Sequence, residues 1–239
     1  MVKPVGFDQK ILLHHLDYTA IQAKTNKRKD MYAILDSYLR NDIGGAKSRK
    51  NAITMLMKIW YVVDEDVIIM RDGLLDVFQG LDRDERLLAH WIMTMVAYPF
   101  FKDVVNELGR LFHLQDDISS VVIGRRMKAT YGDRRRVEVA TGAVLSCMRA
   151  WGVILPIKNR THQKNKPIII DNVDLQAFII HALIKLTNTN SLYINSIHQH
   201  PFLFPFDIDL NLFELREDKS FSFYYQGIND LVVEKNHIY

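Results

Sequence analysis

Residues 131–170 read YGDRRRVEVATGAVLSCMRAWGVILPIKNRTHQKNKPIII. In the first half, apolar side chains recur every three or four residues, at Val137, Ala140, Val144, Met148 and Trp151. This spacing predicts a helix with one buried face, and Asp133 is expected to cap its start. The second half reads as a strand at 152–157, a polar basic loop at 158–166 and a return strand at 167–170. We therefore expect a helix followed by a hairpin with a cationic tip.

Two more helices are predicted immediately before this stretch. An amphipathic helix covers residues 100–112, and Ser119 or Ser120 is expected to cap the next one. That helix should end at Tyr131, because the following Gly132 is the residue type most often found just past a helix end. Three helices followed by a hairpin are the element order of a winged helix-turn-helix, which we predict over residues 99–172.

Residues 1–80 give a weaker version of the same outline. Apolar spacing predicts a helix at 31–39 and, after a glycine pair, a basic helix that begins at the N-cap Ser48 and ends near Trp60. The valine-rich and isoleucine-rich segments at 62–63 and 67–70 read as a short hairpin. A second winged-helix module is therefore expected here.

A weak internal repeat supports two modules. The segment Ile53-x-x-Leu56-x-Lys58-x-Trp60-x-Val62 aligns with Val144-x-x-Cys147-x-Arg149-x-Trp151-x-Val153. In both, a large ring at the helix end is expected to cover the core just before a strand begins. The repeat is evidence for the fold, because these positions face inward.

The remaining segments read as a connecting helix and a cap. Residues 81–98 should form a buried helix, with capping-box spacing between Asp82 and Glu85 and an end before Pro99. Residues 173–239 combine an apolar helix capped by Asn172 with alternating stretches at 210–215 and 221–225. The predicted class is therefore mainly α (α+β), with two winged helix-turn-helix modules joined by a helix and a small C-terminal α+β cap.

Charge is distributed in blocks along a chain whose net charge is only +3. Residues 24–58 carry +6 and residues 125–166 carry +9, whereas the other segments are neutral or acidic. Basic blocks suit polyanionic partners. The single Cys147 excludes an internal disulfide and a thiolate zinc site, and it reads as a small buried residue. No apolar run is long enough to span a bilayer, and we expect a soluble cytoplasmic protein.

The candidate DNA contacts follow from where cations fall on the predicted modules. Arginines at the start of a recognition helix can reach base edges in the major groove, and cations on a hairpin tip contact phosphates. The candidates are Arg134, Arg135 and Arg136 for the groove, Lys158, Arg160, Lys164 and Lys166 (with His162 among them) on the hairpin, Arg125, Arg126 and Lys128 on the preceding helix, and Arg49, Lys50 and Lys58 in the first module. For Arg49, Lys50 and Lys58 the expected partner is either DNA or a protein.

Catalytic signatures are absent: the chain has no GxxxxGK, GxGxxG, HExxH or GxSxG motif. We expect no enzyme, no cofactor and no metal, since the pairs His14-His15 and His198-x-His200 lack spaced partner ligands. Asp207 or Asp209, followed by Glu217-x-Lys219, leaves a Mg²⁺-dependent nuclease as a minor alternative.

On these features the chain resembles bacterial tandem winged-helix proteins and, in general plan, the BrxA-type accessory proteins of BREX phage-defence systems. The resemblance covers residues 29–172 and includes the stretches at 131–134 and 149–153. It implies DNA binding in support of partner proteins, without an activity of its own. We therefore predict a non-catalytic accessory or regulatory subunit that binds double-stranded DNA, with its oligomeric state open. The alternative is a scaffold of a multi-subunit DNA-processing or defence complex. RNA is less favoured, because no exposed aromatic pair falls on a basic strand.

Overall fold

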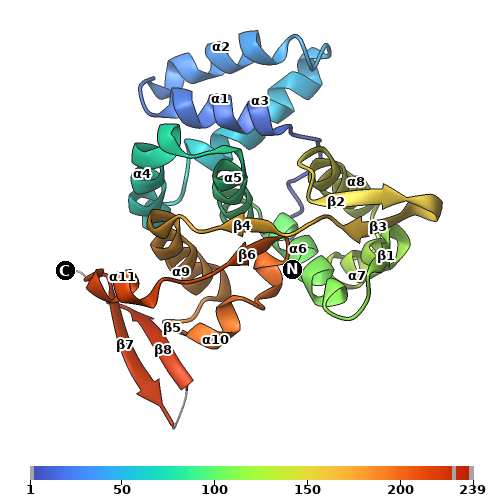
Figure 1. Cartoon of the computed structure of the whole chain (residues 1–239). Helices are drawn as coiled ribbons and strands as arrows, with labels where there is room; N and C mark the ends of the chain where they lie inside the picture. The colour runs from blue at the N-terminus through green and yellow to red at the C-terminus, as the bar shows by residue number, and fades with distance from the viewer. Residues whose placement is uncertain (1–2, 228–229, 237–239) are drawn as a thin grey trace.

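The computed structural model describes residues 3–227 and 230–236, so the outer ends of the first and last predicted segments, residues 1–2 and 237–239, lie outside it. The described chain is mainly helical with three small sheets (Figure 1). The mainly α, α+β class predicted from the sequence is confirmed. None of the described helices is long and apolar enough to cross a membrane.

The N-terminal region is entirely helical in its regular elements. These are α1 (Leu13–Ala23), α2 (Arg28–Leu39), α3 (Ala46–Trp60), the short 3-10 helices η1 (Glu65–Val67) and η2 (Phe78–Gly80), and α4 (Ile68–Val77). The helix α3 begins after Gly45, so Ser48 lies in its first turn and is not its N-cap. The hairpin predicted at 62–70 is wrong, because these residues continue into η1 and α4. Val62 N–H donates to the Met57 carbonyl (2.7 Å), as Val153 N–H does to the Met148 carbonyl (2.9 Å) after α8.

The central helix α5 (Arg83–Ala97) confirms the predicted connecting helix and its capping box. The Asp82 carboxylate accepts from the Glu85 N–H (2.9 Å), and the Glu85 carboxylate accepts from the Asp82 N–H (2.8 Å). Nine consecutive residues, 87–95, are buried. Trp91 lies within 6.3 Å, centroid to centroid, of the rings of Phe101, Trp151, Phe204 and Phe206. This helix therefore packs against elements from the N-terminal, middle and C-terminal parts of the chain.

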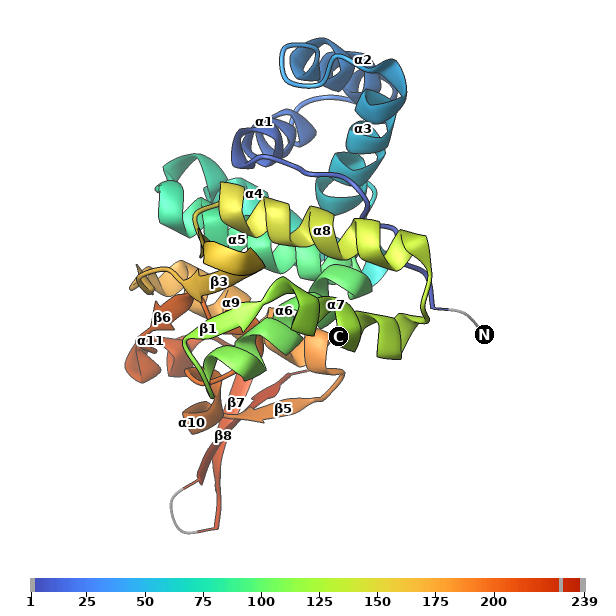
Figure 2. The same ribbon diagram turned by 90° about the vertical axis from the view of Figure 1, so that its right-hand side faces the viewer.

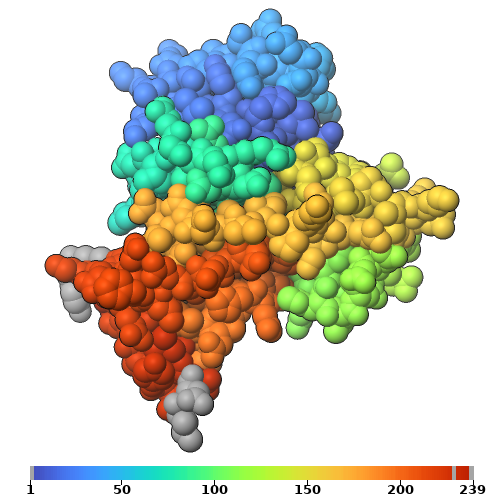
Figure 3. Space-filling view, viewed as in Figure 1, coloured from blue at the N-terminus to red at the C-terminus, as the bar shows by residue number. Residues whose placement is uncertain are grey.

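The middle of the chain alternates helices and strands. In order it forms α6 (Pro99–Phe112), β1 (Asp117–Ser119), α7 (Ser120–Tyr131), α8 (Arg135–Ala150), β2 (Ile154–Ile157), η3 (Lys158–Arg160) and β3 (Thr161–Lys164). The three strands make an antiparallel sheet in the order β1-β3-β2, and His162 pairs with Ile118 on one side and Pro156 on the other. The β2–β3 hairpin projects from the body (Figures 1 and 3).

The sequence predicts the C-terminal end of α8 better than its N-terminal end. Asp133 is not its cap: Arg134 occupies the N-cap position, and the Asp133 carboxylate lies 2.9 Å from Lys128 Nζ. At the other end Gly152 adopts a φ of +77° and donates to the Arg149 carbonyl (3.1 Å). Glycine takes this left-handed conformation without a Cβ clash, so the chain turns sharply into β2.

The return strand of the hairpin lies earlier than predicted. Thr161–Lys164 forms β3 inside the expected loop, so only Lys158–Arg160 remains as a tip. The segment predicted as the return strand becomes β4 (Ile168–Ile170), which pairs in parallel with β6 (Phe206–Ile208). β4 contacts α5 and pairs with β6, with Ile170 buried and Ile169 exposed, and so lies between α5 and the C-terminal region.

The C-terminal region packs beneath α5 and α6. Its further elements are α9 (Val173–Thr187), β5 (Ser191–Tyr193), α10 (Ile194–Ile197), η4 (Pro201–Leu203), α11 (Leu212–Glu217), β7 (Phe221–Gln226) and β8 (Asp230–Lys235), with strand order β5-β8-β7. The Asn172 cap of α9 is confirmed, since its side chain accepts from the Asp174 N–H (3.0 Å). The strand predicted at 210–215 is wrong, because Asn211 caps the helix α11 there. Gly109 of α6 abuts η4, and a Cβ at 109 would lie 2.1 Å from the Pro201 carbonyl oxygen.

Candidate nucleic-acid interface

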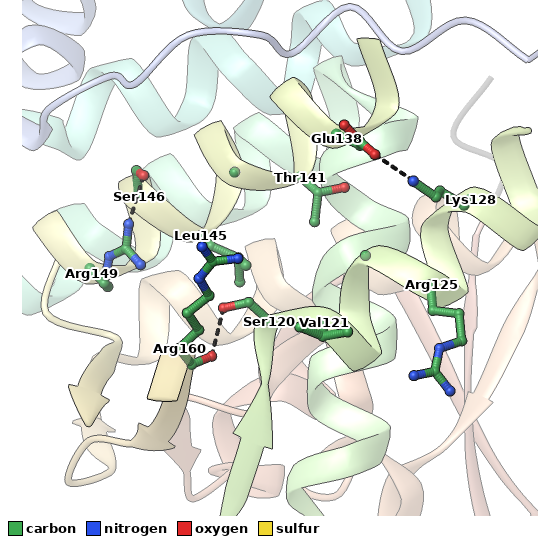
Figure 4. A pocket seen from close by; sticks show the side chains of 12 residues that line it. Ser120, Val121, Arg125, Lys128, Glu138, Thr141, Leu145, Ser146, Arg149 and Arg160 are labelled. Carbon is green, nitrogen blue, oxygen red and sulfur yellow. Dashed lines mark hydrogen bonds and ion pairs between the residues drawn. The ribbon is translucent and has the colours of Figure 1, made fainter. Parts of the chain in front are cut away.

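An open groove of about 670 Å³ lies between α7 and α8, beside the hairpin tip (Figure 4). We call it the α7–α8 groove; its lining residues are Ser120, Val121, Gly124, Arg125, Lys128, Glu138, Thr141, Gly142, Leu145, Ser146, Arg149 and Arg160. Figure 2 shows α8 on the face turned to the viewer, with α7 and β1 next to it. The space next to the two glycines of the groove is open, because a Cβ added at Gly124 or Gly142 would meet no atom within 4 Å.

The helix α8 presents a polar stripe with small residues at its centre. Val137, Ala140, Val144 and Met148 are buried as the sequence predicts. The opposite positions, three or four residues apart, are Arg135, Val139, Gly142, Ser146 and Arg149, of which only Ser146 is half-buried and the rest are exposed. An uncharged middle with arginines at both ends results.

Three arginines at the groove have no carboxylate partner. In the described part of the chain, no acidic oxygen lies within 4.0 Å of Arg125, Arg149 or Arg160. Arg149 instead donates to two neutral acceptors, Ser146 Oγ (2.8 Å) and His162 Nε2 (3.0 Å). The charge of these guanidinium groups is therefore available to an anionic ligand.

Two predicted contact residues on α7 are paired with acids. Lys128 bonds to Asp133 (2.9 Å) and Glu138, and these hydrogen bonds raise the pKa of its ammonium group. Arg126 Nη1 lies 2.6 Å from Glu107 on α6. The cations of Lys128 and Arg126 are thus partly neutralised by the protein itself.

The arginines at the start of α8 do not gather in the groove as predicted. Arg134 Nη2 donates to the carbonyls of Lys3 (3.1 Å) and Tyr131 (2.9 Å), so this side chain anchors the N-terminal segment. Arg136 lies 3.6 Å from Asp8, and the largely exposed Arg135 lies 3.9 Å from Glu138. Of the three, Arg135 remains the most open to solvent.

Two of the three candidate cations of the first basic block contact other groups of the protein. Arg49 bonds to Asp36 (2.7 Å) and donates to the carbonyls of Ile43 and Gly44 (both 3.0 Å). Lys58 Nζ lies 4.7 Å from the ring centroid of Tyr98, a cation–π distance. Lys50 is exposed on α3.

On the hairpin, the predicted phosphate contacts Lys158, Lys164 and Lys166 are all exposed. Lys158 shares the three-residue tip with Arg160, whereas Lys164 and Lys166 lie at the base of the hairpin, away from the tip. Arg149 was missed by sequence reasoning, although its spacing from Gly142 and Ser146 places it on the exposed stripe of α8.

A histidine cluster in the N-terminal region has the atoms of a metal site but a different hydrogen-bond pattern. His14 Nε2 and His15 Nε2 lie 2.8 and 2.9 Å from the same oxygen of Asp42. Leu12 N–H donates to His15 Nδ1 (3.3 Å), so the ring proton of His15 is on Nε2, where a metal would need a lone pair. Metal-bound histidines usually donate from their other nitrogen. The cluster instead ties α1 to the turn after α2.

The remaining candidates serve the fold. His198 Nδ1 bonds to the Ile208 carbonyl (3.0 Å), and His200 Nδ1 accepts from the Phe202 N–H (3.2 Å). Cys147 is buried, as predicted, and burial raises the pKa of its thiol to about 12. Within the described residues, potential metal ligands gather in threes only at the histidine cluster above, and Asp207, Asp209 and Glu217 are not part of such a group.

Comparisons with known proteins yield no relative: no family model, no curated protein and no solved structure matches the chain. The function must be argued from the α7–α8 groove and the charges around it.

Proposed function

We propose that this chain is a non-catalytic protein that binds double-stranded DNA through the α7–α8 groove and the hairpin tip, as an accessory or regulatory subunit. The element order α6-β1-α7-α8-β2-β3 and the strand order β1-β3-β2 support a winged helix-turn-helix in this region. In such a module α8 is the recognition helix and the β2–β3 hairpin is the wing. The first basic region has no comparable hairpin and is not proposed as a second winged helix.

The observation that carries the proposal is the set of three arginines without acidic partners around the small, uncharged residues Gly142 and Ser146 of α8; the one acid that lines the groove, Glu138, is paired with Lys128 and Arg135. A helix with its side chains is about 10–12 Å across and fits a major groove about 12 Å wide. The small residues Gly142 and Ser146 let α8 approach the base edges closely. Arg125, Arg149 and Arg160 then lie at the margins of the contact between α8 and the major groove. There, cations contact phosphates and fix the orientation of the protein on the duplex.

The test compares two glycines in equivalent helical settings. Gly142→Glu places a bulky anion in the groove, whereas Gly73→Glu places the same group on α4, and a Cβ at either position meets no neighbour within 4 Å. We expect fluorescence anisotropy with a mixed-sequence duplex to show at least about tenfold weaker binding for Gly142→Glu. Binding by Gly73→Glu should match the wild type. Equal affinity for both variants and the wild type, or no binding by the wild type at low salt, would reject the proposal.

A protein-docking role is the second candidate, because α4 exposes two adjacent isoleucines that lie close in sequence to several acids. Ile69 of α4 is 88% exposed and Ile68 is 38% exposed, close in sequence to Asp64, Glu65 and Asp72. An exposed apolar pair with acidic neighbours suits a basic partner protein. Ile69→Asp should then abolish complex formation with that partner in gel filtration and leave duplex binding unchanged.

A further inference from the structure

The contact between the hairpin and the recognition-helix candidate α8 is made by a buried histidine. His162 is only 2% exposed, and its Nε2 lies 3.0 Å from Arg149 Nη1. A guanidinium group has only donors, so Nε2 must carry the lone pair and the ring proton must be on Nδ1. That Nδ1 faces Ser120 Oγ at 3.4 Å, and Ser120 in turn donates to the Arg160 carbonyl (2.9 Å).

This pattern holds Arg149 without neutralising it. Its acceptors, His162 and Ser146, are uncharged, whereas the neighbouring Lys128 is held by two carboxylates. A long side chain that is already fixed loses less conformational entropy when a ligand binds. Arg149 is therefore both pre-positioned and fully charged at the groove.

We infer that His162 is a positioning residue for the proposed DNA interface: its neutral ring holds Arg149 at the groove, and protonation of Nε2 releases Arg149 and weakens duplex binding. This inference rests on the proposed function for its effect on DNA. The link between the ring and Arg149 can be measured without DNA.

The groups around the ring set the direction of the switch. Arg149 of α8 is the charged side chain that contacts it; Ser120 of α7 is uncharged, and Ile118 and Pro156 are its register partners on β1 and β2. On β1, the Asp117 carboxylate is engaged by Gln163 Nε2 (2.7 Å). Burial first, and then the positive charge of Arg149, lower the pKa of His162 below the usual 6.5. The ring is thus neutral near pH 7, and Arg149 is released on acidification.

A double-mutant cycle tests whether His162 acts through Arg149. We expect His162→Phe and Arg149→Ala each to weaken duplex binding, by about tenfold if the hydrogen bond to a charged group is fully used. The double variant should bind no more weakly than Arg149→Ala alone. Losses that multiply would overturn the inference. Should His162→Phe fail to fold, His162→Gln replaces it, because its amide oxygen can accept from Arg149: it should retain the affinity but lose the acid-dependent weakening.

An NMR titration separates this inference from the proposed function. In DNA-free protein, protonation of the His162 ring should coincide with a shift of the Arg149 Nε–Hε signal, and the shift should vanish in His162→Gln. In binding assays, acidification should weaken the wild type more than Arg149→Ala, which shares every other titrating group. A ring that titrates without moving the Arg149 signal would refute the coupling. If the signals move together but no duplex binds, the proposed function fails and the coupling stands.

Discussion

The two basic regions, residues 24–58 and 125–166, have similar sequence patterns and different structures. Both hold a basic helix that ends in Trp-x-Val, but the helix end at Trp151 is followed by Gly152 with a φ of +77°, whereas Trp60 is followed by Tyr61 with a φ of −116°. The glycine turns the chain sharply into β2, whereas after Tyr61 the chain passes through the irregular residues 62–64 into η1 and α4. The two helix ends thus differ in the conformation of the first residue after the tryptophan.

Both regions contain cations with and without an acidic partner: in the first, no acidic oxygen of the described chain lies within 4.0 Å of Lys27, Arg28, Lys29, Lys47 or Lys50. In the first, Asp36 accepts from both Arg40 and Arg49, and these hydrogen bonds lower the pKa of its carboxyl group. In the second, Arg125, Arg149 and Arg160 have no acid within reach in the described chain. The net charge of a segment therefore does not report which cations are free; the position of each acid does.

A buried histidine also lies beside or within each region, with a different set of partners: His90 of α5 contacts the end of α3, and His162 lies in β3. His90 accepts from Trp60 Nε1 (3.1 Å) and lies 3.0 Å from Asp17, so it connects α5 to α3 and α1. His162 connects the hairpin to the free cation Arg149. The first contact belongs to the core, and the second belongs to the proposed interface.

The largest effect should come from breaking the core contact. His90→Ala leaves a cavity and an unpaired Trp60 Nε1–H, and we expect it to lower the free energy of unfolding by about 3 kcal/mol. Urea denaturation measures this, with the exposed His113→Ala as the matched control. A loss in His90→Ala no larger than in the control would contradict this account of the N-terminal core.

Loss of three free arginines should have the next largest effect. We expect Arg125→Ala/Arg149→Ala/Arg160→Ala to weaken duplex binding by about 100-fold and to reduce the log–log salt slope by about 3, between about 50 and 200 mM salt. The matched variant Lys27→Ala/Arg28→Ala/Lys29→Ala removes the same charge from the first basic region and should change affinity less than about twofold. Equal losses would mean that total charge, not the groove, governs binding.

Acidification should destabilise the fold through its buried histidines. Burial lowers the pKa of His90, so its contribution to stability is complete above about pH 6.5 and is lost as the pH falls through the folded-state value. The free energy of unfolding should decline as the pH falls below about 6.5, and His90→Phe should show a shallower decline. An unchanged slope in that variant would assign the effect to other groups, of which His15 and His200 are also shifted downward.

Removal of one acid should have the smallest effect, in the opposite direction. Glu138→Gln frees Arg135 and removes one of the two acidic partners of Lys128, so we expect duplex affinity to rise about threefold. Glu107→Gln, which frees Arg126 outside the lining of the groove, is the control for a loss of negative charge. Anisotropy titrations at a fixed salt concentration compare the two.

Local signals predicted the fold best. The capping box at Asp82, the glycine stop at Gly132 and the N-cap Asn172 act through bonds within a few residues, and all three are present. The strand Thr161–Lys164 carries no apolar pattern, and it forms because β2 and β1 supply partners on both sides. Asn211 three residues before Glu214 was a helix signal that the alternating apolar residues concealed.

The site was predicted in part, because its free cations depend on distant contacts. The carbonyl that accepts from Arg134 belongs to Lys3, 131 residues away in sequence. The hydrogen bond from Arg149 to His162 joins a helix to a strand whose register the sequence did not reveal. Arg125 and Arg160 were predicted as contacts from their places on a helix and a hairpin, and no acidic oxygen of the described chain lies within 4.0 Å of either.

The close approach of Gly109 to Pro201 joins the groove-bearing helices to the last third of the molecule. Any side chain at 109 must push η4 away from α6, and with it the Phe202 carbonyl that accepts from Trp91 Nε1 (2.8 Å). One added methyl group, in Gly109→Ala, therefore weakens the packing of α6 against η4. With glycine in place, the groove-bearing helices and the C-terminal region should unfold in a single thermal transition.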